Sequence, residues 1–567
     1  MNTDQLHPKR EFKSIRHIVE YAAKTYGNRI AFSYRQKPHD EEKISISYIE
    51  FRDDVRALAT EMLSRGMNGK HVVVVAKMSY DFIVTYYATL IIGAVLVPLD
   101  KDWGAAELAD TAKNADMDYL FCDCELSDKS DEIVKICELN TPVVFLGSQG
   151  DQGLQAMISA GRVKFSQNKR PYFDFEFDKR QLSLLVYTSG TTGKGKGVML
   201  CTDSIIRDMA DVIHYIDFAE NTVSVLPPHH TYGSTVMLIA HVMIGTEVYI
   251  SNGLKYVQKE LKSEKPGHLI LVPLYLETFY RRIQANLKSK GKDKLVNNML
   301  KISNITRKAS FGLIDMRKKL FAQIRNAFGG EIKTIVTGGA PINQDIVEFF
   351  EGMGISVLNG YGITECAPLI SVNRSRHVVK GSVGTVLDMD DVKIVDPNED
   401  GEGEICVKGP NVMLGYYKND EATAEAIDEE GYFRTGDYGK LTKDRILYIT
   451  GRKKNLIILS NGKNVYPEEI ENELISVPGV QDIIVYEGKS RRGMEYNAIV
   501  AEIFPDKDYI EKNGITDVKA YLQGYLNQYN KTAVPYKKIS VLKVRKEDFP
   551  KNTLRKIMRF KLDMSID

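Results

Sequence analysis

The chain has 567 residues, which is long enough for two or more domains with sizeable cores. Its 76 basic and 75 acidic side chains give a formal net charge of +1, which argues against a dedicated nucleic-acid-binding protein. Six cysteines without a repeated CxxC pair argue against a disulfide framework or a zinc-finger pattern, and they predict reduced thiols in the cytoplasm.

The first residues are polar and lack the apolar core of a signal peptide. The most apolar segment, residues 82–99, contains Gly93 and Pro98 and is marginal for a membrane span, which needs about 20 apolar residues. We therefore expect a buried helix followed by a strand in this segment, and no integral membrane segment.

Apolar β-branched runs alternate with amphipathic helical patterns in the N-terminal part of the chain. We expect helices at residues 14–31, 48–65 and 79–93, and strands at 30–35, 44–48, 71–76, 94–98, 119–122 and 141–146. This alternation is typical of a parallel sheet with helices on both faces.

The chain is organised around residues 187–197, YTSGTTGKGKG. They follow an apolar run, 182–186, and precede an amphipathic segment, 198–210, so we expect a loop between a strand and a helix. Glycines let the backbone amides turn inward, and hydroxyls and two lysines add donors and charge, so the loop can bind a polyphosphate. A P-loop is excluded because Gly197 stands where that motif needs a magnesium-binding Ser or Thr.

A strand in residues 223–233, VSVLPPHHTYG, ends at two prolines and presents His229 and His230 at a cleft. A long helical region, 269–330, follows. Residues 281–333 and 531–561 are rich in basic side chains. These side chains either form a solvated surface or meet the phosphates of a nucleotide or CoA, or an acidic membrane surface.

Two apolar strands then open into glycine turns. Residues 332–336 lead into TGGAP at 337–341, and residues 355–358 lead into NGYGITECAP at 359–368. Both turns can reach one crevice at the strand ends. Tyr361 offers a flat face for adenine, Thr364 a hydroxyl for a phosphate, and Glu365 a carboxylate for magnesium.

From Gly381 onward, short strands and turns predict a β-rich subdomain that ends in GYFRTGDYG, residues 431–439. Residues 448–471, YITGRKKNLIILSNGKNVYPEEIE, follow, and Pro467 with two acidic residues is typical of a helix start. We expect strands at 483–487, 498–504 and 539–544 and a helix at 518–527 in the last domain, which closes with FPKNTLRKIMR at 549–559.

Taken together and in this order, these motifs resemble those of the adenylate-forming (ANL) superfamily of AMP-binding acyl-CoA synthetases, over residues 14–559. The layout of residues 269–330 is most similar to that of the long-chain fatty acid–CoA ligase branch. The resemblance implies an α/β fold with a large N-terminal domain, residues 1–453, made of two doubly wound sheets and a small β-rich subdomain. It also implies a small, mobile α+β C-terminal domain, residues 454–567, that carries a catalytic lysine.

The resemblance also implies a role for each matching residue. Lys556, Thr364, Glu365 and His230 are expected to act in catalysis; Glu365 binds Mg²⁺, Lys454 is the hinge, and Gly462 lies at the thiol channel. The expected nucleotide-binding residues are Thr188, Ser189, Gly190, Thr191, Thr192, Gly193, Lys196, Gly338, Gly339, Ala340, Asn359, Gly360, Tyr361, Gly362, Thr364, Asp437, Arg452 and Lys556. The chain departs from the usual motifs at Gly195, Asn455 and Arg555, where proline, an acidic residue and glycine are common.

The implied reaction joins a carboxylic acid to ATP as an acyl-adenylate, releases pyrophosphate, and then transfers the acyl group to CoA with release of AMP. A medium- or long-chain fatty acid is the expected substrate. The alternatives are loading of a separate acyl carrier protein, an aryl or other carboxylic acid–CoA ligase, and a non-catalytic nucleotide- or lipid-binding regulator. We expect a cytoplasmic protein, with peripheral membrane contact left open.

Overall fold

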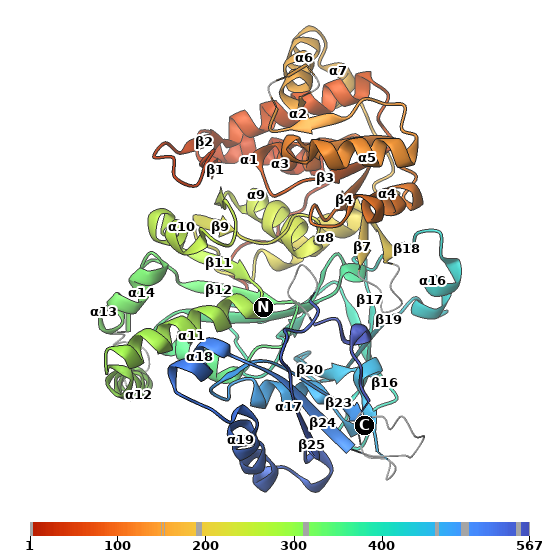
Figure 1. Cartoon of the computed structure of the whole chain (residues 1–567). Helices are drawn as coiled ribbons and strands as arrows, with labels where there is room; N and C mark the ends of the chain where they lie inside the picture. The colour runs from red at the N-terminus through yellow and green to blue at the C-terminus, as the bar shows by residue number, and fades with distance from the viewer. Residues whose placement is uncertain are drawn as a thin grey trace.

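The computed structural model describes residues 4–565 apart from 149, 152, 189–194, 310–316, 460–463, 489–497 and 552–556. The described strands form six sheets, with helices packed around them. Strands β1 to β4 lie in the upper part of Figure 1, and the small C-terminal sheet with β23, β24 and β25 lies at the bottom. The expected α/β class, with a large N-terminal and a small C-terminal domain, is confirmed; the boundary at residue 453 stays a prediction.

The largest sheet has seven strands in the order β18-β8-β7-β4-β3-β5-β6, and those from β7 to β6 are parallel. The strands are β3 His71–Val75, β4 Val95–Leu99, β5 Tyr119–Asp123, β6 Val144–Leu146, β7 Leu182–Thr188, β8 Lys196–Cys201 and β18 Gly415–Tyr416. The helices that accompany it are α2 Tyr48–Ser64, α3 Tyr80–Ile91, α4 Ala105–Asn114, α5 Ser127–Cys137, α6 Leu154–Gln167 and α7 Arg170–Phe173.

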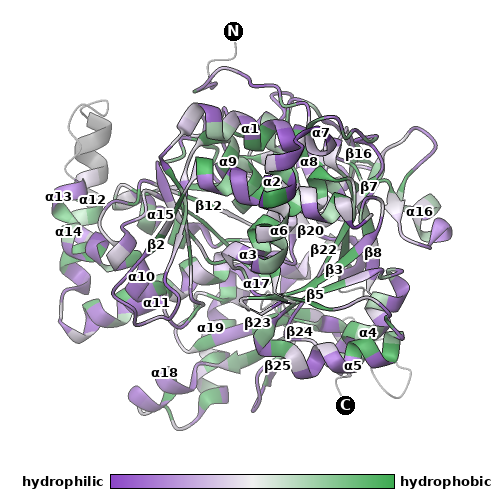
Figure 2. Ribbon diagram, turned by 90° about the horizontal axis from the view of Figure 1, so that it is seen from above, coloured by the Kyte–Doolittle hydropathy of each residue, from purple (hydrophilic) through white to green (hydrophobic). Residues whose placement is uncertain are grey.

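Alternating residues of β3 show that helices cover both faces of this sheet. Val72 and Val74 pack in the cluster that contains α2, α3 and α6, whereas Val73 and Val75 pack with α4 and α5. Strands β3 and β5 are accordingly mainly hydrophobic in Figure 2, while α10, Val257–Glu264, is largely hydrophilic at the edge. The helix and strand expected in residues 82–99 are confirmed, and no helix within the described ranges has the length and apolarity to cross a membrane.

The expected strands at 30–35 and 44–48 do form, but they were assigned to the wrong sheet. They are β1 Ile30–Tyr34 and β2 Ile44–Ser47, and they join β9 Asn221–Ser224 and β10 Glu247–Ile250 in a separate mixed sheet. Helix α1, Ile15–Tyr26, directly precedes β1 in the chain. Strand β1 pairs in parallel with β10, which follows it by some 200 residues, so its partner could not be read from local pattern.

The expectation that residues 187–197 join a strand to a helix is wrong. Residues Lys196–Cys201 form β8, which pairs antiparallel with β7, and the helix α8 begins only at Thr202 and ends at Val212. A short apolar run such as 198–200 cannot be assigned to helix or strand by periodicity. The glycine-rich segment therefore connects two paired strands.

Two further sheets belong to the N-terminal domain. The first has the order β11-β12-β13-β14-β15, parallel over its first three strands and antiparallel over the rest, so it is mixed and not fully doubly wound. Its strands are β11 His268–Leu271, β12 Thr334–Gly338, β13 Ser356–Gly362, β14 Leu369–Val372 and β15 Thr385–Val386. The second is antiparallel and contains β16 Asp391–Val395, β17 Gly403–Lys408, β19 Phe433–Leu441 and β20 Leu447–Arg452, which confirms the expected β-rich subdomain.

The helical region between β11 and β12 contains α11 Pro273–Ser289, α12 Asp293–Ala309, α13 Arg317–Leu320 and α14 Ala322–Arg325, and α15 Gln344–Gly352 and α16 Asp420–Ala426 follow. The small domain has β21 Ile457–Ile458, β22 Asn464–Val465, α17 Pro467–Leu474, β23 Val480–Gly488, β24 Ala498–Pro505, α18 Lys507–Lys512, α19 Val518–Thr532 and β25 Val541–Val544. The main chain of Gln481 accepts a hydrogen bond from Arg281 of α11 (3.2 Å), and Asn472 accepts one from Asn343 before α15 (3.0 Å).

A buried pair of histidines links the helix that begins at His241 to strand β11, which begins at His268. His268 Nδ1 accepts the Ala219 N–H (3.1 Å), so the proton of neutral His268 is on Nε2, which faces His241 Nε2 at 2.8 Å. His241 then carries its proton on Nδ1, which donates to the Met237 carbonyl (2.7 Å). One neutral tautomer of each ring satisfies all four nitrogens.

We expect this pair to make the fold sensitive to acid. Burial lowers the pKa of His241 to about 4, below the usual value of 6.5, so the unfolded chain takes up a proton there that the folded chain does not. The contribution of His241 to the free energy of unfolding is therefore fully present above pH 6.5. The free energy of unfolding should fall by about 2 kcal/mol between pH 6.5 and pH 5. Urea unfolding at both pH values measures this. In His241→Gln the pH slope should be smaller, whereas the control His39→Gln, at an exposed histidine, should keep it; equal slopes in all three proteins would contradict the prediction.

Candidate active site

The end of β13 and two strands of the β-rich subdomain bring together three predicted nucleotide-binding residues. Tyr361 donates its hydroxyl proton to Asp437 Oδ2 (2.7 Å), and Arg452 Nε lies 3.0 Å from Asp437 Oδ1. Asp437 and Arg452 are direct partners in the β19–β20 register. The Asp437 carboxylate raises the pKa of Arg452, and burial together with that carboxylate raises the pKa of Tyr361, so the site holds a fixed carboxylate beside a fixed cation.

A second network holds Glu365, which lies in the 3₁₀ turn Thr364–Cys366. Tyr416 donates its hydroxyl proton to Glu365 Oε1 (2.9 Å), and the Glu365 carbonyl accepts the N–H of Met413 (2.8 Å). The Lys196 ammonium lies 4.6 Å from the centroid of the Tyr416 ring. Since β18 pairs with β8, the residues that follow the glycine-rich segment lie beside the turn that carries Glu365.

Sequence reasoning missed Tyr416 and Met413. Neither lies in a recognisable motif, and each reaches the site only because the two-residue strand β18 returns to the edge of the large sheet. An aromatic pair at Tyr416 and Tyr417 is the one local signal, and it does not indicate a partner.

The glycines of the two strand-end turns are required by close backbone contacts. A Cβ on Gly338 would lie 2.9 Å from the Gly360 carbonyl oxygen, and one on Gly362 would lie 2.1 Å from that of Pro368. Gly339 has a φ of +83°, and Ala340 follows it after the end of β12. In the same register, Thr337 Oγ1 and Asn359 Oδ1 are buried and have no hydrogen-bond partner among the described residues, so polar groups there are available to a ligand.

His230 lies against His229, with ring centroids 4.2 Å apart, and its carbonyl accepts the N–H of Gly233 (2.9 Å) at the start of a π-helical segment, Tyr232–Ala240. The Tyr232 hydroxyl is 3.3 Å from the Val336 carbonyl oxygen, so this segment is held beside the end of β12. Burial lowers the pKa of His229 to about 4, which keeps that ring neutral at pH 7. α9, His241–Ile244, continues the segment.

The ends of the glycine-rich segment are held together. Thr188 and Lys196 are partners in the β7–β8 register, and Thr188 donates its hydroxyl proton to the Lys196 carbonyl (3.4 Å). The intervening predicted residues Ser189, Gly190, Thr191, Thr192 and Gly193 lie outside the described residues, as do Lys556 and Gly462. Lys454 lies in the turn Lys453–Asn455 directly after β20, where burial and the charge of Arg452 lower its pKa. The functional roles assigned to all these residues stay predictions.

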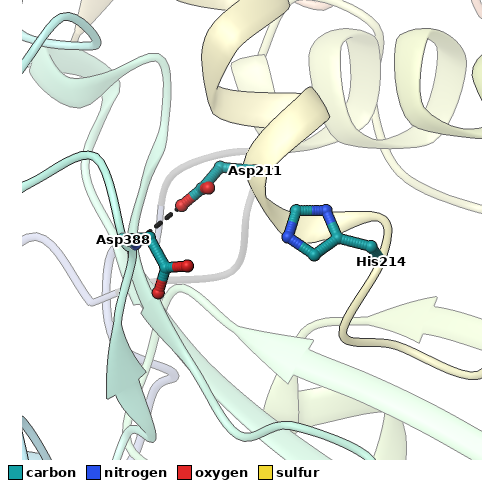
Figure 3. Close-up of side chains that lie close together, drawn as sticks. All are labelled: Asp211, His214 and Asp388. Atoms are coloured by element: carbon teal, nitrogen blue, oxygen red, sulfur yellow. Dashed lines mark hydrogen bonds between the residues drawn. The ribbon is translucent and has the colours of Figure 1, made fainter. Parts of the chain in front are cut away.

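A different group of potential ligands lies away from these motifs. Asp211, His214 and Asp388 each bring one ligand atom within 4.8 Å of the others, and Asp211 accepts a hydrogen bond from the Asp388 main chain (2.7 Å; Figure 3). The Lys9 ammonium lies 3.0 Å from Asp388 Oδ2 and 3.6 Å from Asp211 Oδ1, and Arg374 lies 2.9 Å from Asp388 Oδ1. Because these cations already neutralise the carboxylates, the group anchors the N-terminal segment and is not assigned as a metal site.

The model of the AMP-binding enzyme family matches residues 19–417. Long-chain-fatty-acid–CoA ligase 5 of Rattus norvegicus is 27% identical over 528 residues, which cover 86% of this chain and 75% of the relative. Long-chain-fatty-acid–[acyl-carrier-protein] ligase AEE15, chloroplastic, of Arabidopsis thaliana is 25% identical over 574 residues, covering 88% of this chain and 77% of the relative. Among solved structures, ATP-bound MatB from Rhodopseudomonas palustris shares the fold with a TM-score of 0.73 and 22% identity, over 96% of this chain and 98% of that one. The chain therefore belongs to the AMP-binding enzyme family, the adenylate-forming superfamily that includes the AMP-forming acid–thiol ligases.

Proposed function

We propose that the protein is an AMP-forming acyl-CoA synthetase that acts on medium- or long-chain fatty acids through an acyl-adenylate. The observation that carries the proposal is that two networks meet at one turn: Tyr361 belongs to the Asp437–Arg452 network, and Glu365, four residues on, belongs to the Tyr416–Lys196 network. Ribose recognition and phosphate recognition can thus occur side by side.

The Asp437 carboxylate can still bind a ribose. In the folded chain its Oδ2 accepts one hydrogen bond, from Tyr361, and its Oδ1 is ion-paired with Arg452, and a carboxylate has about four lone-pair sites. Two ribose hydroxyls can therefore donate to the same group. The Arg452 guanidinium lies beside them and can contact the nucleotide phosphate.

The donors around Glu365 fit a magnesium ion. Magnesium in nucleotide sites takes one or two carboxylates together with phosphate oxygens, and Glu365 has one oxygen, Oε2, to which no hydrogen bond is recorded from the described part of the chain. When bound, the ion would supply positive charge to the β and γ phosphates. Thr188 and Lys196 hold the ends of the loop that is expected to wrap those phosphates.

In the first half-reaction the substrate carboxylate attacks the α-phosphorus of ATP, pyrophosphate leaves, and Lys556 offsets the negative charge that gathers there. In the second, the CoA thiol attacks the acyl carbonyl and AMP leaves. We propose that the small domain turns about Lys454 between the two, which withdraws Lys556 and brings Gly462 to the thiol channel.

The fatty acid assignment is supported by the name of the rat relative, a long-chain-fatty-acid–CoA ligase, and by the helical region between β11 and β12. The Arabidopsis relative, named as an acyl-carrier-protein ligase, supports the alternative acceptor. The test is pyrophosphate release over a panel of aliphatic and aromatic acids, followed by incubation of the best acid with ATP and either CoA or an acyl carrier protein. Pyrophosphate release with aromatic acids alone would contradict a fatty acid substrate. Acyl transfer to the carrier protein alone would contradict CoA as the acceptor. If no acid supports pyrophosphate release, the remaining candidate is a non-catalytic binding protein.

Asp437→Asn should weaken AMP binding about tenfold, or about 1.4 kcal/mol, because the amide has one acceptor oxygen and turns a donor toward Tyr361 or Arg452. Titration calorimetry with AMP measures the loss. The matched control is Asp391→Asn on β16 of the same sheet, since Asp391 Oδ2 accepts a tyrosine hydroxyl from Tyr432 in the same way (2.6 Å). An equal loss in both variants would show that Asp437 acts on the fold of the sheet and not on the nucleotide.

We also propose that the turn between α11 and α12 contacts anionic membranes, where a long-chain fatty acid partitions. Leu295 and Ile302 are 56% and 61% exposed, and their spacing of seven residues places them on one side of α12. Four exposed lysines surround the start of that helix, and none of them forms an ion pair with another described residue: Lys288, Lys290, Lys292 and Lys294. Each contributes about 1 kcal/mol near an anionic surface.

Binding to vesicles of phosphatidylglycerol and phosphatidylcholine tests this contact by sedimentation. Changing the four lysines to glutamate should abolish binding, and Leu295→Ser should weaken it. Val163→Ser is the control, because Val163 is 57% exposed but its neighbour Lys164 is paired with Glu61 (2.7 Å). Unchanged binding by the lysine variant would contradict the proposal, as would binding to an acidic carrier protein without binding to vesicles.

A further inference from the structure

A buried carboxyl–amide pair lies beside the turn that carries Glu365. Asp390 is 3% exposed and Asn411 is fully buried, and Asn411 Nδ2 donates to Asp390 Oδ2 at 3.0 Å. The second oxygens of the two side chains, Asp390 Oδ1 and Asn411 Oδ1, are buried and accept no hydrogen bond from the described residues. These two oxygens lie beside the same point, next to Gly409. A Cβ placed on Gly409 would lie 2.0 Å from Asp390 Oδ1 and 2.7 Å from Asn411 Oδ1.

Two acceptor oxygens in this arrangement repel each other, and each is left buried without a donor. One added proton removes the repulsion between the two oxygens and joins them by a hydrogen bond. If it is on Asp390 Oδ1, that O–H donates to Asn411 Oδ1 while Asp390 Oδ2 still accepts the amide N–H, which closes a ring of two hydrogen bonds. The other amide hydrogen is already used, because Asn411 Nδ2 also donates to the Leu369 carbonyl (2.8 Å).

We propose that Asp390 is a neutral carboxylic acid in the folded protein and that its pair with Asn411 is a positioning device for the turn that presents Thr364 and Glu365.

The groups that face Asp390 favour the neutral form. Burial is the largest cause and raises the pKa of Asp390 to about 8. The hydrogen bond from Asn411 lowers this pKa, the negative charge of Asp211 raises it further, and the positive charge of Arg445 lowers it. Asp208 is fully buried nearby, its Oδ1 has no partner among the described residues, and burial raises its pKa as well. An ionised Asp390 would therefore face a second buried carboxyl group.

Leu369 connects this pair to the turn. Its carbonyl accepts the Asn411 amide, and its N–H donates to Asp208 Oδ2 (3.0 Å), so both of its main-chain groups are held by the buried cluster. The preceding residue, Pro368, accepts the N–H of Ile363 (2.8 Å) and closes the turn around Glu365. Loss of the proton from Asp390 breaks the ring and frees the Asn411 side chain to move, and the turn loses one of its supports.

The decisive variant is Asp390→Asn, because an amide reproduces the neutral acid: its oxygen accepts from Asn411 Nδ2 and its NH₂ donates to Asn411 Oδ1. The folded pKa of about 8 exceeds the unfolded value of 3.8, so the folded chain binds the extra proton between these values. The contribution of Asp390 to the free energy of unfolding is thus fully present below pH 4 and is lost as the pH rises through 8. The urea midpoint of the wild type should fall between pH 6 and 9, and that of Asp390→Asn should fall less.

Infrared difference spectroscopy between the two proteins at pH 7 should show a protonated carboxyl band that the variant lacks and that the wild type loses above pH 9. The control is Asp388→Asn, two residues away, because Asp388 is paired with Lys9 and Arg374 and should show no such band. Absence of the Asp390 band, or the same pH dependence of stability in Asp390→Asn and wild type, would overturn the neutral acid.

The positioning role rests on the proposed function and has its own readout. Pyrophosphate release by the wild type should decline as pH rises through 8, and in Asp390→Asn this decline should move to higher pH, while Asp390→Ala should lower kcat already at pH 7. An unchanged alkaline limb in Asp390→Asn would overturn the positioning role. If no acid supports pyrophosphate release by the wild type, the proposed function fails, and the infrared and stability results still decide whether Asp390 is neutral.

Discussion

Replacing Glu365 by glutamine is expected to lower acid-dependent pyrophosphate release by about 10²- to 10³-fold at saturating ATP and magnesium. An amide has no charge and is a poor ligand for a hard cation, so the charge of the phosphates is no longer offset at this position. The fold should survive, because the amide oxygen of glutamine can still accept the Tyr416 hydroxyl proton and the main-chain bond from Met413 is untouched. Steady-state kinetics and a thermal unfolding curve of the same sample measure both quantities.

The small domain offers a matched control for this variant. Glu502 accepts the hydroxyl proton of Tyr486 at 2.8 Å, the same contact that Glu365 makes with Tyr416, and Glu502 lies on β24 outside the proposed site. Glu502→Gln should keep the activity even if it lowers the unfolding temperature. A variant of Glu365 that keeps its activity, or one that unfolds together with its loss of activity, would remove Glu365 from the proposed metal site.

Replacing Lys556 by alanine is expected to lower formation of the acyl-adenylate by about 10²- to 10³-fold and to leave transfer from a supplied acyl-adenylate to CoA nearly unchanged. In the proposed mechanism the lysine acts where the substrate carboxylate meets the α-phosphate, because negative charge gathers in that half-reaction alone. Among the described residues on either side, Lys551 and Ile557 form a β-bridge, and Arg559 donates to the Val485 carbonyl of β23 (2.8 Å). The described residues after Lys556 are thus held by the small domain.

The two half-reactions are measured separately, by pyrophosphate release and by thioester formation from synthetic acyl-adenylate. Lys561→Ala removes an exposed lysine from the same C-terminal segment and should change neither rate. Equal losses in both half-reactions of Lys556→Ala would contradict a domain rotation that withdraws the lysine between steps.

Local pattern was sufficient for the first three helices of the N-terminal domain, α1 to α3, and for strands such as β3 to β5. Helix α2 follows a capping box formed by Ser47 and Glu50, and its apolar residues recur at helical spacing, so it was expected at 48–65 and found at Tyr48–Ser64. The paired strands β7 and β8 show the opposite case. The run 198–200 is too short to distinguish helix from strand, and its conformation is decided by hydrogen bonds to β7 on one side and β18 on the other.

The residues of the candidate site also fall into those that the sequence predicted and those that only the structure revealed. Tyr361, Glu365, Asp437 and Arg452 were predicted from motifs that resemble those of the adenylate-forming superfamily, and the structure joins Tyr361, Asp437 and Arg452 by one hydrogen bond and one ion pair. Tyr416 was not found, because its contact with Glu365 depends on a pairing between β18 and β8 that local sequence does not encode.

By itself, the sequence determined the class of fold, the order of the motifs and the types of side chain available for ribose, phosphate and metal, because these depend on composition, periodicity and local turn chemistry. Only the tertiary structure decided which sheet received β1, which tyrosine holds Glu365, and which buried carboxyl group faces an amide oxygen. Those outcomes depend on contacts between segments far apart in the chain, where burial removes water and makes each unpaired polar atom costly. Asp390 and Asn411 illustrate the difference: in the sequence they are two ordinary polar residues, and only their burial against each other calls for a proton between them.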